Sequence, residues 1–405
     1  MPIPQSATIV APRPSGRMGR GAAVWLVVSI VVTFLAASSA PSPLYAVYRE
    51  AWGFSAFTLT VVFASYAFAL LSALLVFGAL SDHIGRRSVI LLALALELGS
   101  VLLFWQAEST GWLLAARVLQ GVATGIATSA LSATLLDLDP IRGALLNSVA
   151  PMFGMALGAL GTSALVQFAP APTRLVFDLL LLLFALQTLG ALFLPDTVSR
   201  RAGAWPSLIP SVHLPAQARP TMWRIAPLNT AGWALGGFYL SLGPTLARLI
   251  SGVPSPLIGG ALISTLVMSG AVAIFVTRRH PPQAVLPGSA LALGGGLALT
   301  LIGVQWSSSA ALFAGTLVAG LGFGAGFNAA VRRLVPLALP HERAGLMSSF
   351  FVMSYLAFSV PAIGAGLAVG WFGLHATTLG YGSLLIVMTL VAWLGARPAA
   401  RRVAD

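Results

Sequence analysis

The chain has 405 residues, of which 58% are hydrophobic and 8% are charged, whereas a soluble domain carries about 25% charged residues. This composition excludes an ordinary soluble globular protein, because so few charged side chains cannot cover the surface of a folded chain of this length. We therefore expect much of the surface to face lipid.

The charge is strongly positive but does not point to nucleic acid. The formal net charge is +12, and all 22 basic residues are arginines. They lie at the ends of apolar runs, without the interleaved aromatic residues of a nucleic-acid-binding face, so we expect no nucleic-acid partner. The absence of lysine excludes a Walker A loop and with it an ATP-hydrolysing pump of that kind. With no cysteine and five isolated histidines, the sequence predicts no metal site and no cofactor.

Twelve apolar runs follow one another along the chain, and each is close to the ~20 residues that a helix needs to cross a bilayer. They cover residues 23–44, 56–80, 88–107, 111–135, 144–168, 175–194, 225–248, 255–277, 288–305, 309–331, 345–370 and 375–396. The sequence therefore predicts an all-α membrane protein with twelve transmembrane helices.

The region between the sixth and seventh runs differs from the rest in composition. Residues 195–222 contain several prolines and the pair Arg200 and Arg201, a pattern typical of a polar linker. We expect an N-terminal tail and six-helix bundle in residues 1–194, a cytoplasmic linker in 195–222, and a C-terminal six-helix bundle and tail in 223–405.

The two halves share a pattern of small residues. Gly121 and Gly125 in the fourth run match Gly320 and Gly324 in the tenth run, 199 residues later. A proline followed by an arginine and a glycine opens both the fifth and the eleventh runs. Parallel repeats with a binding site at their interface are a known plan for transporters. We therefore predict two pseudo-symmetric bundles.

The arginines also predict the orientation of the chain, because arginine-rich loops remain on the cytoplasmic side. With the N-terminus inside, 18 arginines fall in cytoplasmic loops and tails, and three, Arg49, Arg174 and Arg248, fall outside. The remaining one, Arg117, lies within a span. We expect a multi-pass protein of the inner (cytoplasmic) membrane, in contact with its lipids, with both termini in the cytoplasm.

Two motifs carry a resemblance to a known family. Residues 78–87 read Gly-Ala-Leu-Ser-Asp-His-Ile-Gly-Arg-Arg and closely resemble the signature loop of the major facilitator superfamily, G-x-L-x-D-R-x-G-R-R, with His83 where Arg or Lys is usual. Residues 117–121, Arg-Val-Leu-Gln-Gly, resemble its R-x-x-Q-G motif. Within the superfamily the chain is most similar to the drug-proton antiporters and the related sugar-efflux group, although the antiporter motif of span five is only partly present at 150–155. We expect a monomer.

The loop of residues 78–87 is the candidate gate motif, formed by Gly78, Asp82, Gly85, Arg86 and Arg87. The first glycine allows span two to approach a neighbour closely, and the second permits a tight turn. The aspartate can meet the positive N-terminal end of another helix, and the resemblance implies that this helix is span eleven. The arginines can bind carboxylates or lipid phosphates. The alternative is that these charges only fix the topology.

Polar residues in spans four, seven and ten indicate a substrate cavity, because the superfamily lines its cavity with these helices. Arg117 is the main candidate, since an intramembrane charge is costly unless it is paired or faces water, and its counterpart in the second half, Thr316, is uncharged. We expect the cavity to be lined by Arg117, Gln120, Thr124, Asn229, Thr230, Trp233 and Asn328.

Glu97, at the middle of span three, is the candidate for proton coupling, together with Arg117. A buried carboxylate can exchange protons near neutrality, as coupling to a proton gradient requires. An interhelical hydrogen bond explains the residue equally well. Asp178 lies four residues after Arg174, which favours a local ion pair, and Asp137 is expected in solvent at the end of span four.

These features predict a secondary transporter that moves a small organic molecule by alternating access, with proton-coupled efflux as the first hypothesis. The alternatives are a facilitator or importer of sugars or other metabolites and, from a different class, a transporter-like scaffold or sensor. We expect no enzyme, since the sequence displays no nucleophile with a base and no metal cluster.

The arginine distribution predicts that both termini and the linker are cytoplasmic. Because the natural chain has no cysteine, single cysteines introduced there should react with a membrane-impermeant thiol reagent only when it has access to the cytoplasmic side. Labelling of either terminus from outside intact cells would contradict the topology.

Overall fold

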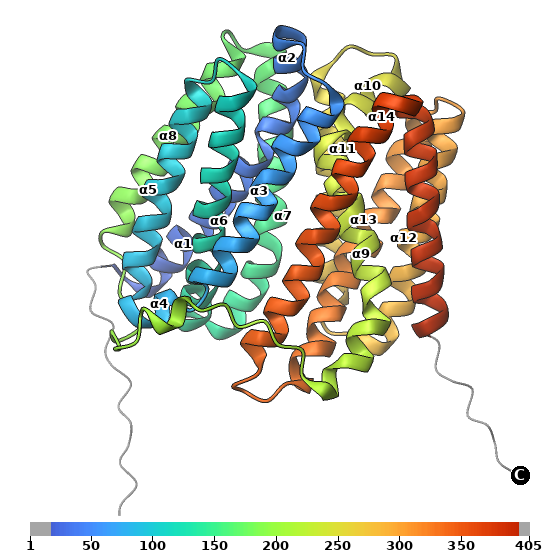
Figure 1. The fold of residues 1–405 in the computed structure, drawn as a ribbon. Helices are drawn as coiled ribbons and strands as arrows, with labels where there is room; N and C mark the ends of the chain where they lie inside the picture. The colour runs from blue at the N-terminus through green and yellow to red at the C-terminus, as the bar shows by residue number, and fades with distance from the viewer. Residues whose placement is uncertain (1–17, 397–405) are drawn as a thin grey trace, which may run out of the picture.

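The computed structural model describes residues 18–396, and its regular structure in that range is helical (Figure 1). In the first half the helices are α1 (Arg20–Ser39), α2 (Pro41–Trp52), α3 (Ala56–Phe77), α4 (Leu80–Ile84), α5 (Arg86–Trp105), α6 (Thr110–Leu138), α7 (Pro140–Phe168) and α8 (Pro172–Ala191).

The second half repeats this plan after a connection with two short 3-10 turns, η1 (Pro206–Leu208) and η2 (Ala216–Ala218). Its helices are α9 (Arg219–Ser241), α10 (Gly243–Ser251), α11 (Pro256–Thr277), α12 (Pro282–Gln305), α13 (Ser309–Leu334) and α14 (Arg343–Ala396), with the turn η3 (Val335–Leu337) before α14. The first helix of this half begins at Arg219, six residues before the apolar run at 225 and four before the expected domain boundary at 223, because its first turn is polar.

The helices account for the twelve predicted crossings. Within residues 18–396, ten helical segments are long and apolar enough to cross a membrane. One of them, α14, has 54 residues and a non-helical backbone at Gly373 (φ 77°), so it supplies two crossings. The helix α9 is not among the ten, since Arg219, Arg224 and Asn229 lower its hydropathy, but it runs between the same two faces as its neighbours (Figure 1). The prediction of an all-α membrane protein with two six-helix bundles is confirmed.

The outer surface is apolar, as a lipid-facing surface must be. On α8 the side chains of Leu182, Leu186 and Leu189 are more than half exposed, and on α14 so are those of Leu384 and Leu394. Such a surface would be unstable in water.

The repeated glycines make equivalent contacts in the two halves. A Cβ atom on Gly121 or Gly125 of α6 would collide with the backbone of α3, and one on Gly320 or Gly324 of α13 would collide with the backbone of α11. These helices are spans four and two in the first half, and spans ten and eight in the second. Close packing without side chains is the usual way to join helices in lipid.

We call the face that carries the 192–218 connection the linker side, and the other face the far side. The described ends of α1 and α14 also lie on the linker side (Figure 1). Direct polar contacts between the two halves concentrate toward the far side. Glu50 of α2 and Arg248 of α10 form an ion pair at 4.0 Å, and Ser255 Oγ donates to Gln167 Oε1 at 3.0 Å. Deeper in the bundle, Ser264 Oγ donates to the carbonyl oxygen of residue 156 at 3.0 Å. The halves are therefore closed together on the far side.

The far-side closure depends on small residues between α7 and α11. A Cβ on Gly260 would collide with Ser163 and with the backbone of Ala159 across the interface, whereas a Cβ on Gly161 would meet nothing within 4 Å. We expect Gly260→Leu to destabilise this closed arrangement by about 1–3 kcal/mol through overpacking, with a lower thermal midpoint and longer spin-label distances across the far side. Gly161→Leu is the matched control and should change neither quantity.

Candidate functional site

The gate motif forms a short structured turn on the linker side. Gly85 has φ 97° and ψ 144°, a conformation that strongly favours glycine. A Cβ there would also collide with the carboxylate of Asp196, whose Oδ1 accepts a hydrogen bond from the backbone N–H of Arg86 at 2.9 Å. The turn glycine is therefore required both by the backbone angle and by the close carboxylate.

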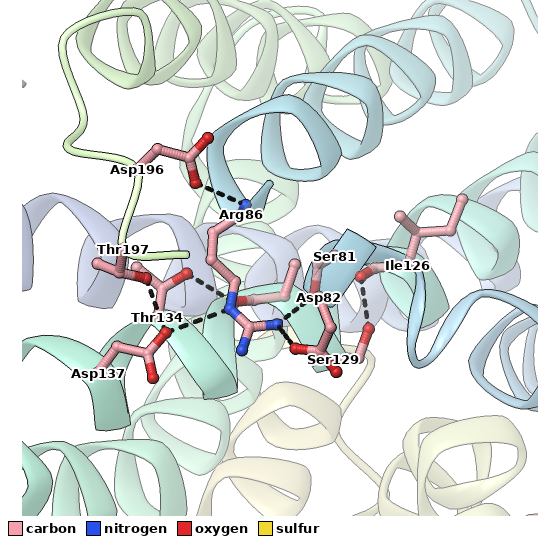
Figure 2. Close-up of polar contacts among 10 residues, drawn as sticks. Ser81, Asp82, Arg86, Ile126, Ser129, Thr134, Asp137, Asp196 and Thr197 are labelled. Atoms are coloured by element: carbon pink, nitrogen blue, oxygen red, sulfur yellow. Dashed lines mark hydrogen bonds and ion pairs between the residues drawn. The ribbon is translucent and has the colours of Figure 1, made fainter. Parts of the chain in front are cut away.

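Arg86 is the centre of the motif (Figure 2). Its Nη1 pairs with Asp82 Oδ1 at 2.5 Å and donates to Ser81 Oγ at 2.6 Å, and its Nε donates to Asp137 Oδ2 at 3.2 Å. The same Asp137 oxygen accepts from Thr197 Oγ1 at 2.7 Å. One buried guanidinium thus joins the loop between spans two and three, the end of α6 and the start of the connection. Asp137 is exposed at the end of α6, as expected, but it also has Arg86 as an ion-pair partner, which the sequence pattern does not indicate.

The contacts of Asp82 differ from those that the resemblance implies. Its side chain is 53% exposed and pairs with Arg86 of the same loop, and no hydrogen bond joins it to α14 within residues 18–396. A carboxylate and a guanidinium four residues apart are near neighbours, so the local pair forms first. In this arrangement the motif is anchored within the first half.

The connection is attached to both halves. His83 Nδ1 lies 3.2 Å from the carbonyl oxygen of Ala202, and the backbone of the same histidine accepts from Arg201 N–H at 2.9 Å. At the other end, His213 N–H donates to the carbonyl oxygen of Gly345 at the start of α14 at 3.3 Å. The histidine that replaces the usual basic residue of the motif is therefore part of the attachment to the connection.

Glu97, Gln120 and Arg117 form a polar cluster in the interior of the first half. The side chain of each is at most 1% exposed. Gln120 Nε2 donates to Glu97 Oε1 at 3.2 Å, and Arg117 Nη1 donates to Gln120 Oε1 at 2.7 Å. The amide of Gln120 therefore links a carboxylate on α5 to a guanidinium on α6. Thr124, one turn further along α6, is also buried but uses its hydroxyl on the carbonyl oxygen of Gln120.

The guanidinium of Arg117 is held by the backbone and by aromatic rings. Its Nη1 also donates to the carbonyl oxygen of Ser38 on α1 at 2.8 Å. Its Cζ lies 4.5 Å from the ring centre of Tyr66 and 5.8 Å from that of Phe63, both on α3. Cation–π contacts of this kind partly offset the cost of burying the charge. No pattern along the chain indicates these rings as partners of the arginine.

Three polar atoms of this cluster have no hydrogen-bond partner among the described residues: Glu97 Oε2, Arg117 Nε and the hydroxyl of Tyr45. Tyr45 on α2 lies close to the guanidinium. Unpaired buried polar atoms are costly, each by about 1–3 kcal/mol. The cluster therefore retains capacity for a further partner, such as a proton, a water molecule or a polar group of a ligand.

The expected ion pair between Arg174 and Asp178 is not present. Asp178 Oδ1 instead accepts a hydrogen bond from Trp105 Nε1 at 2.9 Å, and Arg174 Cζ lies 5.5 Å from the ring centre of the same tryptophan. Both charged side chains are thus directed to a neighbouring helix, α5, which spacing along α8 could not reveal.

The residues expected to line the cavity in the second half lie around an aromatic group on α9, α13 and α14. Asn229 is 4% exposed, and Trp233, one turn later, is partly buried among aromatic rings. Thr230 and Asn328 are partly buried. The ring of Phe358 lies 5.8 Å from that of Trp233 and 5.0 Å from that of Phe63 in the first half. Aromatic side chains therefore connect the surroundings of Arg117 to those of Trp233, while separating the two polar groups.

The chain belongs to the Major Facilitator Superfamily, whose sequence model matches residues 26–360. It is thus a transporter of that superfamily and a multi-pass membrane protein. A search of curated protein sequences finds no match.

Solved structures with the same fold include transporters of several kinds. The nucleoside transporter NupG is 15% identical, with a TM-score of 0.72, and the match covers 92% of this chain and 99% of that one. A bacterial homologue of the human lysosomal transporter Spinster, in an inward-facing and unoccupied conformation, is 14% identical, with a TM-score of 0.76 and coverage of 93% and 97%. The human organic anion transporter MFSD10 is 18% identical, with a TM-score of 0.62 and coverage of 93% and 100%. These likenesses show the shared fold.

The gate motif predicts a specific phenotype for Asp82→Asn. The variant should fold, because Arg86 keeps its contacts with Ser81 and Asp137. Loss of one partly exposed ion pair changes the balance between conformations by roughly 0.2–1 kcal/mol, so we expect transport to slow by up to about 5-fold. Glu108→Gln, an equal charge change on the far side, is the control. Normal transport together with unchanged spin-label distances across the linker side would contradict a gate role.

Proposed function

We propose that the protein is a proton-coupled secondary transporter that exports a small organic molecule across the cytoplasmic membrane by alternating access. The observation that carries the proposal is the buried chain of contacts from Glu97 through Gln120 to Arg117. A structural hydrogen bond would not require a carboxylate and a guanidinium linked in this way. An ionisable residue inside a membrane domain is a functional-site hypothesis by default.

The cluster has the features that proton coupling requires. Burial favours the neutral form of a carboxylate, whereas a nearby guanidinium favours the charged form. A small movement of Arg117 relative to Glu97 would therefore change the proton affinity of the carboxylate. Arginine remains protonated, so it tunes the carrier and does not carry the proton. The Glu97 oxygen that lacks a hydrogen bond is the atom available to the proton.

The second half carries a neutral version of the cluster. Thr316, the counterpart of Arg117, has its hydroxyl 2.8 Å from that of Tyr239. Both side chains are fully buried. A hydrogen-bonded pair of hydroxyls is sufficient for packing at this position, which supports a role other than packing for the charges of the first half.

The pattern of contacts between the halves fits one state of an alternating-access cycle. The halves are joined on the far side by Glu50 with Arg248 and by Gln167 with Ser255. If the linker side is cytoplasmic, this state is closed to the outside. We assign export as the direction because the chain resembles the drug-proton antiporters and the sugar-efflux group, whose span-five motif is partly present at residues 150–155.

The proposal predicts that Glu97→Gln abolishes gradient-driven accumulation but not substrate binding. Glutamine keeps the size of the side chain and can still hydrogen-bond to Gln120, but it cannot take up or release a proton. The measurement is proton movement together with substrate movement in liposomes that contain the purified protein, with and without an imposed pH gradient. Exchange of substrate without a gradient should persist.

Three further variants make this experiment decisive. Arg117→Lys keeps the charge but loses the planar fork, so it should restore only part of the activity that Arg117→Ala loses. Asp178→Asn removes the other membrane carboxylate and should leave coupling intact. Full gradient-driven transport by Glu97→Gln would exclude Glu97 from the mechanism and favour a facilitator or importer. Absence of any transport in every condition would favour a scaffold or sensor.

A further inference from the structure

Trp233 lies at the centre of a group of aromatic rings that we call the aromatic box. Its ring makes edge-to-face contacts with rings on two other helices. The ring-centre distances are 6.5 Å to Phe323, 5.8 Å to Phe327, 5.0 Å to Tyr355 and 5.8 Å to Phe358. Flat aromatic walls favour flat, apolar ring systems, since stacked and edge-to-face rings attract one another beyond their buried area.

The amide of Asn229 is oriented by its neighbours. Ser354 Oγ donates its proton to the carbonyl oxygen of Phe350 at 2.8 Å and therefore acts as an acceptor toward Asn229 Nδ2, which lies 2.8 Å away. Because a hydroxyl has only one proton to donate, the nitrogen of the amide faces Ser354. The oxygen of the amide is left on the other side, as an acceptor.

That oxygen has no partner among the described residues, and the side chain lines a small void. Asn229 Oδ1 is buried and unpaired, and the void is bounded by Leu228, Asn229, Gly322, Phe323 and Phe327. It has about 10 Å³ of space for the centre of a water molecule, enough for roughly one water. A buried amide oxygen without a partner favours any ligand that brings a donor to it.

A second unpaired polar atom lies one helical turn away. Trp233 Nε1 is buried and has no hydrogen-bond partner among the described residues. Residues four apart on a helix lie on the same face, so Asn229 supplies an acceptor and Trp233 a donor to one side of α9. A ligand that satisfies both carries a donor for the amide oxygen and an acceptor for the indole N–H.

The aromatic box borders the interface between the halves. Phe358, one of its walls, contacts Phe63 of the first half, and both belong to a buried cluster with Tyr66 and Ile263. Separation of the halves during the transport cycle would break this contact and expose the Phe358 wall of the box. A ligand can then approach the box from the interface between the halves.

We propose that the aromatic box with Asn229 and Trp233 is the part of the substrate site that selects flat ring compounds with an adjacent hydrogen-bond donor and acceptor, such as a cyclic amide fused to an aromatic ring. The inference rests on the proposed transport function for its biological role. The residues of the aromatic box all lie in the second half. Their arrangement does not depend on the charged cluster around Arg117 or on proton coupling.

The test is equilibrium binding to the full-length protein in lipid nanodiscs, with empty nanodiscs as the blank for partition into lipid. The three probes have the same ring size: 2-quinolone carries an adjacent donor and acceptor, quinoline an acceptor alone, and naphthalene neither. We expect 2-quinolone to bind about 10-fold more tightly than naphthalene, with quinoline between them, since the three probes can form two, one and no hydrogen bonds to the two side chains.

The variants assign this preference to the two side chains. Asn229→Leu and Trp233→Phe should each weaken binding of 2-quinolone by about 3- to 10-fold and leave naphthalene within about 2-fold of its original affinity. Tyr239→Phe, which removes another buried polar group of α9 outside the box, is the control and should change neither. If Asn229→Leu does not fold, Asn229→Thr keeps an acceptor in a shorter side chain and should bind 2-quinolone with intermediate affinity.

Two results would overturn the inference. The first is that the unaltered protein binds the three probes with equal affinity, or binds none of them. The second is that Asn229→Leu binds 2-quinolone as tightly as the unaltered protein does. Both can occur in a protein that still transports against a pH gradient in liposomes. Conversely, preserved selectivity without any gradient-driven transport would contradict the proposed function and leave this site intact.

Discussion

The absence of water inside a bilayer is the constraint on which the rest of this structure depends. Each polar group within the spans must find a partner in the protein or remain costly. Helices satisfy the backbone, and the side chains follow the same rule: the guanidinium of Arg117 takes a backbone carbonyl, an amide and two aromatic rings. The buried polar atoms of the described residues that have no partner include two in the first half, on Glu97 and Arg117, and two on α9, on Asn229 and Trp233. These are the places where we propose chemistry and recognition.

Most of the fold could be predicted from the sequence because hydropathy reports directly on contact with lipid. The exceptions have physical reasons. The helix α9 tolerates Arg224 because that side chain is exposed near the start of the helix, and Asn229 because its amide donates a hydrogen bond to Ser354. Spans eleven and twelve follow each other with only a break at Gly373 between them. The sequence pattern places the start of α9 too late, because the polar first turn of this helix has the composition of a linker.

The candidate sites were predictable to a smaller extent. Residues such as Arg117 and Glu97 stand out because charge is rare in a span, but their connection through Gln120 depends on the side-by-side packing of α5 and α6. Besides its local partners, Arg86 has partners at residues 137 and 196, which no local spacing indicates. Likewise, Asp178 was assigned to the nearest charge along its own helix, whereas the structure directs it to Trp105 on another helix.

The attachment of the connection at both ends has a mechanical consequence. One end is fixed to the first half at Ala202, and the other to α14 at His213. Between them lie ten residues, 203–212, a length of chain that can extend to about 35 Å. This length is the upper limit on the separation of the two attachment points while both contacts hold. The connection therefore limits how far the linker-side ends of the two bundles can move apart before one attachment has to break.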